Sequence, residues 1–135
     1  MVYEDRIERF LAGAPHAVVG ASTNRDKYGN KVLRAYVQNQ REVYPVNPNA
    51  ASVQGLTAYP DLMALPVVPH GISIITPPAV TEGIVVQAIE LAIEHIWMQP
   101  GAESIEAVRR AEAAGLSVIH SGPCLLVVLG YRESA

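Results

Sequence analysis

The sequence contains a single cysteine, Cys124, so no disulfide can form within the chain, and no Cys/His spacing resembles a zinc site. No apolar run approaches the ~20 residues of a membrane-spanning helix, and the acidic first residues contain no apolar signal core. The chain also lacks a long basic segment, and its net charge of −3 gives no general attraction to nucleic acid or to an anionic membrane. We therefore expect a soluble cytoplasmic protein that binds neither nucleic acid nor membrane and recognises any phosphate locally.

Only part of the glycine pattern that binds dinucleotides is present. Gly20 fits its first position, but Ser22 and Arg25 stand where Gly-x-Gly-x-x-Gly has its second and third glycines. The second predicted strand ends in Asn47 rather than in the acid that would hold the ribose of NAD. Plain NAD binding is therefore disfavoured, although Arg25 and Arg41 could accept an additional phosphate, as on NADP.

Groups that would carry catalysis are also scarce. No carboxylate pair, Ser/His/Asp order or metal cluster falls at the ends of the predicted strands, where chemistry on this fold is expected. Cys124 has no neighbouring base in the sequence and is interpreted as a small buried hydrophobe, and His95 and His120 as packing or surface residues. We therefore expect a binding protein rather than an enzyme.

What the chain does contain is a regular alternation of helical and strand patterns. Half of its 135 residues are hydrophobic, enough for one α/β domain and too few for two. Strands are predicted at about 16–21, 42–47, 71–75, 95–98 and 116–119, and helices at 4–12, after Gly29, after Thr76 and at 103–114. The apolar residues 125–129 form either a sixth strand or a short packing segment. This order predicts a single domain over residues 1–135, with a three-layer α/β/α Rossmann-like fold and a doubly wound parallel sheet of five to six strands.

Prolines mark two places where local structure can be predicted. Pro45 lies inside the second strand and removes a hydrogen-bond donor, so we expect an irregularity there or a donor position facing the ligand cleft. Thr76 is the predicted N-cap of the long helix, with Pro77 and Pro78 in its first turn.

The predicted strands end in breaker or small polar clusters, which parallel packing would bring to one edge of the sheet. The first cluster begins at Gly20, directly after Val18 and Val19. Backbone N–H groups of such a turn, together with the N-terminus of the following helix, are suited to binding phosphate. The sequence thus predicts a nucleotide site at the carboxyl ends of the strands.

Four motifs support a more specific interpretation. They are Val18-Val19-Gly20-Ala21-Ser22, Tyr28-Gly29 at a helix start, Val43-Tyr44-Pro45-Val46-Asn47-Pro48, and Ala111-Glu112-Ala113-Ala114-Gly115-Leu116. In this order they resemble the small stand-alone CoA-binding domain proteins, which are similar to the N-terminal domain of the succinyl-CoA synthetase α subunit. The resemblance runs from about Phe10 to Cys124 and implies that the ligand is coenzyme A or an acyl-CoA.

The resemblance also implies which residues contact CoA. The pyrophosphate would be held by the loop of Gly20, Ala21, Ser22, Thr23, Asn24 and Arg25, with Arg41 near the nucleotide phosphate and Asn47 and Pro48 by the adenosine. Thr76, Pro77 and Pro78 would cover the adenine and pantetheine, Met98, Gln99, Pro100 and Gly101 would follow the pantetheine arm, and Pro123 and Cys124 would form a turn near the thiol.

This chain departs from the stand-alone relatives in two loops. Those relatives often end the third strand in Asp-x-Phe-Arg and the fifth in Asp-Arg-Cys, where this chain has Ser73-Ile74-Ile75-Thr76 and Ser121-Gly122-Pro123-Cys124. Both loops look closer to the ligase subunit. The phosphorylated histidine of the synthetase belongs to a later domain, so no histidine of this sequence inherits its role.

Two other classes of function stay open. One is an enzyme, either an NADP-type oxidoreductase or an acyl-CoA enzyme that uses Cys124. The other is a CoA-responsive regulatory module that binds an unidentified partner protein.

Overall fold

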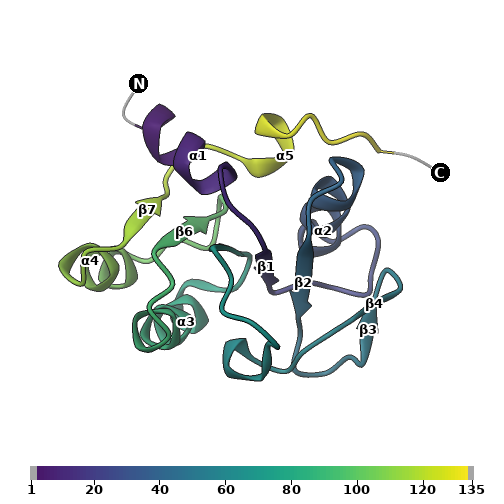
Figure 1. The fold of residues 1–135 in the computed structure, drawn as a ribbon, viewed down its shortest axis with the longest axis horizontal. Helices are drawn as coiled ribbons and strands as arrows, with labels where there is room; N and C mark the ends of the chain where they lie inside the picture. The colour runs from purple at the N-terminus through teal and green to yellow at the C-terminus, as the bar shows by residue number, and fades with distance from the viewer. Residues whose placement is uncertain (1–2, 134–135) are drawn as a thin grey trace.

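The computed structural model describes residues 3–133, which form a five-stranded parallel sheet flanked by helices (Figure 1). The strand order is β2-β1-β5-β6-β7. The strands are β1 (His16–Val19), β2 (Val43–Val46), β5 (Gly71–Ile74), β6 (His95–Met98) and β7 (Ser117–Ile119), and β3 (Ser52–Val53) and β4 (Leu56–Thr57) form a separate antiparallel hairpin. The helices are α1 (Glu4–Leu11), α2 (Tyr28–Gln38), α3 (Pro78–Glu90), α4 (Ile105–Ala113), α5 (Leu125–Val128) and the short 3-10 helix η1 (Leu62–Ala64). The predicted Rossmann-like α/β fold is confirmed.

Helices cover both faces of the sheet, and each face has its own hydrophobic core (Figure 1). α1, α2 and α5 lie on the upper side in this view, where Phe10, Leu33 and Trp97 are fully buried. α3 and α4 lie on the lower side, where Val85 and Ile96 are fully buried. Because both faces are covered, β1 and β5 are continuous runs of buried residues rather than alternating ones.

β2 is an edge strand, and it accommodates Pro45 without the irregularity expected from the sequence. β1 and β2 pair in regular parallel register, with Val18 opposite Pro45. The Pro45 carbonyl accepts a hydrogen bond at 3.0 Å from the backbone N–H of Tyr59, which lies on the other side of β2. Proline is tolerated on an edge strand because the missing donor is not needed by the ladder.

The structure corrects the predicted start of one helix and decides between the two alternatives left open for residues 125–129. Pro77, not Thr76, occupies the N-cap position of α3, and no side chain caps this helix. The Thr76 hydroxyl instead hydrogen-bonds the Thr81 hydroxyl at 2.7 Å, within the first turn. At the other end of the chain, Leu125 begins the short helix α5 and is fully buried, so this segment packs as a helix and adds no sixth strand.

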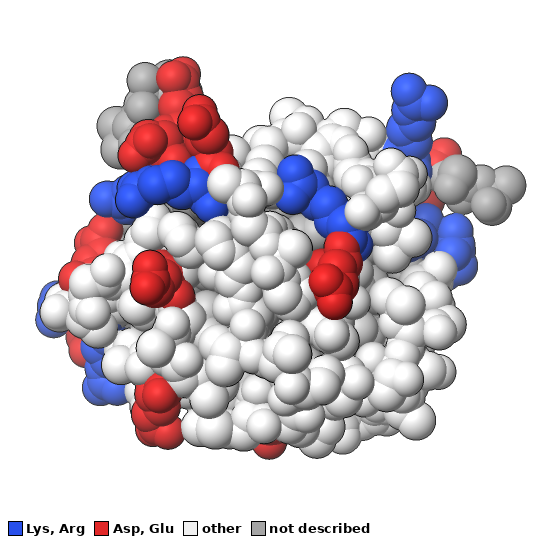
Figure 2. Space-filling model, viewed as in Figure 1, with Lys and Arg blue, Asp and Glu red and all other residues white. Residues whose placement is uncertain are grey.

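Charged groups are unevenly spread over the molecule. On the face shown in Figure 2, acidic side chains gather over α1 with basic side chains beside them, and the centre of the face carries few charges. Within residues 3–133 no helix is long and apolar enough to span a membrane. In the same range, no three His, Cys, Asp or Glu side chains are grouped to hold a metal ion.

Candidate functional site

The carboxyl ends of the parallel strands lie along one edge of the sheet. The chain passes from β1 to β2 on one side and reaches β5 on the other, so β1 and β5 flank the point where the topology reverses. Gly20 directly follows β1, and Thr76 lies two residues beyond β5. Open parallel sheets bind ligands in the crevice at such a point, which makes this edge the candidate site.

Gly20 is required by the backbone at the end of β1. Its φ is +97°, which glycine adopts readily, and a Cβ at this position would overlap the Ile75 carbonyl. Gly29, in the first turn of α2, is similarly confined, because a Cβ there would overlap the Gly20 carbonyl. The two glycines let the end of β5, the turn after β1 and the start of α2 pack backbone to backbone. This is a structural reason for Gly20, separate from the phosphate binding by the turn's backbone N–H groups that the sequence suggested.

The loop between β1 and α2 is shaped by its own hydrogen bonds. Ser22 Oγ accepts a hydrogen bond from Asn24 N–H at 3.1 Å, and Asn24 Oδ1 accepts one from Asp26 N–H at 3.0 Å. Lys27 N–H donates to the Asn24 carbonyl at 3.0 Å. These three N–H groups are therefore occupied within the loop, and a phosphate would be bound by other donors of the loop and of α2. Among residues 3–133 no side chain caps α2, and its first turn contains no acid, so no carboxylate of that turn offsets the positive end of the helix.

A buried polar network holds this loop against α2. Asn30 is fully buried and Arg34 is 6% exposed. Asn30 Nδ2 donates to the Ser22 carbonyl at 2.8 Å, and the Arg34 guanidinium donates to Asn30 Oδ1 at 2.7 Å. The same guanidinium donates to the Arg25 carbonyl at 2.6 Å. Sequence reasoning missed Asn30 and Arg34, although two polar residues one helical turn apart on a largely buried helix are a signal for such a network.

Asn47 and Thr76 also contribute to the shape of the site. Asn47 Nδ2 donates to the Ala21 carbonyl at 2.8 Å, and its Oδ1 accepts a hydrogen bond from Asn49 N–H at 2.7 Å. Both ends of the Asn47 amide are thus engaged by backbone, as the Thr76 hydroxyl is by Thr81. Four of the five prolines expected beside the ligand are exposed, namely Pro48, Pro77, Pro78 and Pro100, and the fifth, Pro123, is half-buried.

A second polar cluster joins the ends of β6, α2 and α5. Gln99 is fully buried, and its Oε1 accepts hydrogen bonds from Tyr28 OH at 3.2 Å and from Leu125 N–H at 2.9 Å. The Tyr28 hydroxyl also lies within hydrogen-bonding distance of Cys124 Sγ. Burial raises the pKa of Tyr28 above its ordinary value, and the contact with Cys124 raises it further. The hydroxyl therefore stays protonated at neutral pH and remains a donor.

Glu103 ties the loops after β6 and β7 together. Its carboxylate accepts hydrogen bonds from Gly101 N–H at 2.8 Å and from Ser121 N–H at 3.2 Å. A hollow of about 210 Å³ adjoins these loops and is lined in part by Ile105 and His120. The Gly101 loop, which the sequence placed along the ligand, is thus fixed to the β7 loop.

Three predicted contact residues do not present their side chains to this edge. Arg41 precedes β2 and lies at the opposite edge, because the amino ends of parallel strands point away from their carboxyl ends. Its guanidinium donates to the Leu11 carbonyl at 2.9 Å, so its expected place near a nucleotide phosphate does not hold. The side chains of Met98 and Ala21 are buried in the two cores, which leaves only their backbone available to a ligand.

Known proteins share this arrangement of strands and loops. Residues 15–130 match the CoA binding domain family. The chain belongs to this family. Similar solved structures include a conserved hypothetical protein from Pyrococcus furiosus, with 38% identity and a TM-score of 0.81 over 86% of this chain and 99% of that chain. A hypothetical protein from Pyrococcus horikoshii OT3 has 28% identity and a TM-score of 0.87 over 94% of this chain and 89% of that chain.

This chain is also similar to part of a longer chain. The dinucleotide forming acetyl-coenzyme A synthetase 1 of Ca. Korarchaeum cryptofilum, in complex with phosphate and ADP, has 28% identity and a TM-score of 0.75. The match covers 84% of this chain and 27% of the synthetase chain. The family expected from the four sequence motifs is therefore confirmed.

Proposed function

We propose that this chain binds coenzyme A or an acyl-CoA at the carboxyl edge of its sheet, without transforming it. Membership of the CoA-binding domain family supports CoA as the ligand. The proposed location of the ligand rests on the junction between β1 and α2. There the Gly20 turn and the uncapped start of α2 meet at the switch point between β1 and β5.

Phosphate binding would depend on the start of α2. Lys27 holds the N-cap position in an extended conformation, and within the described range 3–133 no side chain accepts the N–H groups of the first turn. A pyrophosphate placed there would accept hydrogen bonds from these groups and would be favoured by the helix dipole. Arg25 is exposed in the same loop, and its guanidinium donates to Gln54 Oε1 at 3.3 Å. A guanidinium binds a phosphate oxygen more strongly than a neutral amide oxygen, so Arg25 is a candidate phosphate ligand.

Support for the loop comes from the network beneath it. The buried Asn30 and Arg34 side chains hold the Ser22 and Arg25 carbonyls, so the loop backbone is ordered before a ligand arrives. A loop that is already ordered loses less conformational entropy on binding. The proposal therefore treats Asn30 and Arg34 as residues that position the loop rather than contact the ligand.

A thermal-shift series with CoA, acetyl-CoA, NADP, NAD and ATP, confirmed by calorimetry, tests the proposal. At about one hundred times its dissociation constant a ligand stabilises the fold by about 2.7 kcal/mol, which is a rise of several degrees for a domain of this size. We expect this rise with CoA or acetyl-CoA and not with the others. No rise with CoA or acetyl-CoA, or a larger rise with NADP, would contradict the proposal. Turnover of acetyl-CoA during prolonged incubation would contradict it as well.

Two arginine variants locate the site. Arg25→Ala should weaken CoA binding about tenfold or more, the usual loss for one hydrogen bond to a charged group. Arg41→Ala is the matched control, because Arg41 lies at the opposite edge and contacts the Leu11 carbonyl. It should leave the affinities for CoA and dephospho-CoA unchanged. The reverse result, with Arg41 important and Arg25 not, would move the site to the amino edge of the sheet.

A further inference from the structure

Cys124, the single cysteine of the chain, lies at the carboxyl edge of the sheet beside the start of α2. Its side chain is partly exposed, and Sγ contacts the hydroxyl of Tyr28, the first residue of α2. The N-terminus of the same helix is the proposed phosphate site. Cys124 is therefore only partly shielded from solvent, and it shares an edge with the proposed ligand.

The backbone on both sides of Cys124 is held in place by buried side chains. The Pro123 carbonyl accepts a hydrogen bond from Trp97 Nε1 at 3.0 Å, and Leu125 N–H donates to Gln99 Oε1 at 2.9 Å. Trp97 and Gln99 are both fully buried. The position of the sulfur is thus set by the core rather than by a free loop.

Gln99 also offers a donor that no atom of residues 3–133 accepts. Leu125 N–H can only donate, so Oε1 must face it, and this orients the carboxamide. Gln99 Nε2 is then buried and has no partner among the described residues. The carboxamide is held beside Cys124 through Tyr28 on one side and Leu125 on the other. A carbonyl, such as those in the pantetheine arm of CoA, would satisfy this donor, whose isolation otherwise costs free energy.

We infer that Cys124 captures the oxidised form of CoA, its disulfide, by thiol–disulfide exchange at this cluster. The Cys124 thiolate attacks one sulfur of CoA disulfide, a Cys124–S–S–CoA bond forms, and the second CoA leaves as a thiolate. The leaving thiolate or solvent takes the proton given up by Cys124, and the number of disulfide bonds is unchanged. The inference rests on the proposed function, because a bound CoA moiety is what brings its sulfur to Cys124.

Tyr28 acts as a positioning residue in this exchange. Its hydroxyl is protonated at neutral pH. When Cys124 becomes a thiolate, the single hydroxyl proton can turn from Gln99 Oε1 to the sulfur and donate a hydrogen bond to it. Tyr28→Phe keeps the ring and removes the donor. The exchange rate of this variant should therefore rise only at higher pH than in the wild type. A purely structural role of the ring would leave the pH profile where it is.

Mass spectrometry of the intact chain after incubation with CoA disulfide, with glutathione disulfide in parallel, tests the inference. We expect one CoA per chain, removable by dithiothreitol, and formed at least about tenfold faster than the glutathione adduct because binding raises the local concentration of the disulfide. Cys124→Ser should form no adduct, and Tyr28→Phe should react more slowly. Tyr44 lies on β2, and its hydroxyl donates to Glu42 at 3.4 Å. Tyr44→Phe is the matched control and should react as the wild type does.

Absence of an adduct, or equal rates with the two disulfides, would overturn the inference. Calorimetry with reduced CoA and a reductant separates this result from failure of the proposed function. A chain that binds reduced CoA but does not prefer CoA disulfide keeps the proposed function and loses the inference. A chain that binds no CoA loses both. Thermal unfolding of each variant shows that it is folded.

Discussion

Among single residues, Gly20 and Gly101 form a matched pair. Comparing them separates two reasons for a glycine, namely a positive φ and a lack of space for a Cβ. Their φ values are nearly equal, +97° and +95°, so an alanine would strain the backbone at both positions. A Cβ at Gly20 would overlap the Ile75 carbonyl, whereas a Cβ at Gly101 would meet no atom within 4 Å. The difference between the two positions is therefore the packing of β1 against β5.

We predict that Gly20→Ala lowers the free energy of unfolding by about 1–3 kcal/mol more than Gly101→Ala does, because the overlapping carbonyl belongs to the neighbouring chain segment and must move. Urea denaturation of the wild type and both variants at one pH measures the difference. Equal losses would mean that the sheet edge yields freely and that Gly20 is needed only for its φ.

Sequence reasoning found the polar residues of the site more readily than their partners. Asn47 follows a strand and was expected beside the adenosine, but backbone groups of Ala21 and Asn49 engage its amide. The family resemblance placed Arg41 near a phosphate, yet the direction of β2 carries it to the other edge. Residue type and order are visible in a sequence. Hydrogen-bond partners depend on how distant segments pack, and residue type and order do not reveal that packing.

At the level of elements, the sheet was predictable because each strand is a short apolar run that ends in a breaker or small polar cluster. The β3–β4 hairpin and the helix α5 were not, since strands of two residues and a helix of four show no periodicity. Their conformation follows from burial. Val53 of the hairpin and Leu125 of α5 both pack in the core beneath α2.

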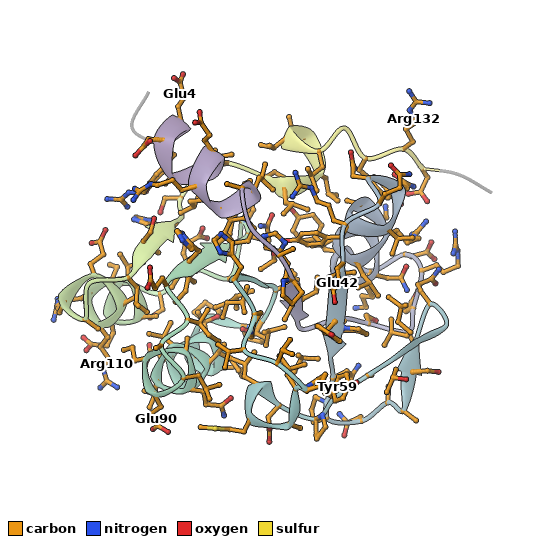
Figure 3. The ribbon with its side chains drawn as sticks, in the orientation of Figure 1. Glu4, Glu42, Tyr59, Glu90, Arg110 and Arg132 are labelled. Carbon is orange, nitrogen blue, oxygen red and sulfur yellow. The ribbon has the colours of Figure 1, made fainter. Side chains whose placement is uncertain are left out.

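The helix α2 joins the candidate loop to the C-terminal segment through Arg34. Its guanidinium donates to the Arg25 carbonyl at 2.6 Å and to Glu133 Oε2 at 3.2 Å. In Figure 3, Arg132 lies on the same C-terminal segment and points away from the molecule. The planar guanidinium can serve Asn30, the loop and Glu133 together, which the single ammonium of a lysine cannot do.

We predict that Arg34→Lys lowers the free energy of unfolding by about 1–3 kcal/mol, because buried acceptors lose their donors, and that it weakens CoA binding as the loop loses support. Arg109→Lys is the matched control, since Arg109 is an exposed residue of α4 that pairs with Glu106 at 3.3 Å. It should change stability by less than about 0.5 kcal/mol. Denaturation and calorimetry give the two quantities. Lower stability with unchanged affinity would show that the Arg34 network serves the fold alone.

For the molecule as a whole, the two edges of the sheet differ in character. The carboxyl edge carries the candidate site, and the amino edge gathers His16, His70 and His95. The ring centroids of His16 and His70 are 5.8 Å apart, and those of His70 and His95 are 4.5 Å apart. His16 also stacks on Phe10, with 4.7 Å between the ring centroids. Because His16 and His95 lie away from the candidate site, their titration should act on stability rather than on ligand binding.

His16 is the most strongly perturbed of these groups. It is fully buried, its Nε2 donates to the Phe10 carbonyl at 2.8 Å, and its Nδ1 has no partner among the residues described. Burial lowers the pKa of His16 from 6.5 to about 4, against the Phe10 carbonyl, which favours the charged ring. His70, Arg41 and His95 add repulsion of the charged form. The unfolded chain therefore takes up a proton near pH 6.5 that the folded chain takes up only near pH 4.

We predict that this difference destabilises the protein as the pH falls from 6.5 towards about 4. Above pH 6.5 the ring is neutral in both the folded and the unfolded state, so it causes no loss of stability. By about pH 4 the free energy of unfolding should have fallen by about 3 kcal/mol. Urea denaturation of the wild type, His16→Gln and His120→Gln between about pH 7 and pH 5 measures the slope. His16→Gln should flatten it, and His120→Gln, which alters a partly exposed ring, should not. If His16→Gln keeps the wild-type dependence of stability on pH, the proton is taken up by another histidine. His95, whose pKa is also lowered by burial, is then the next residue to replace.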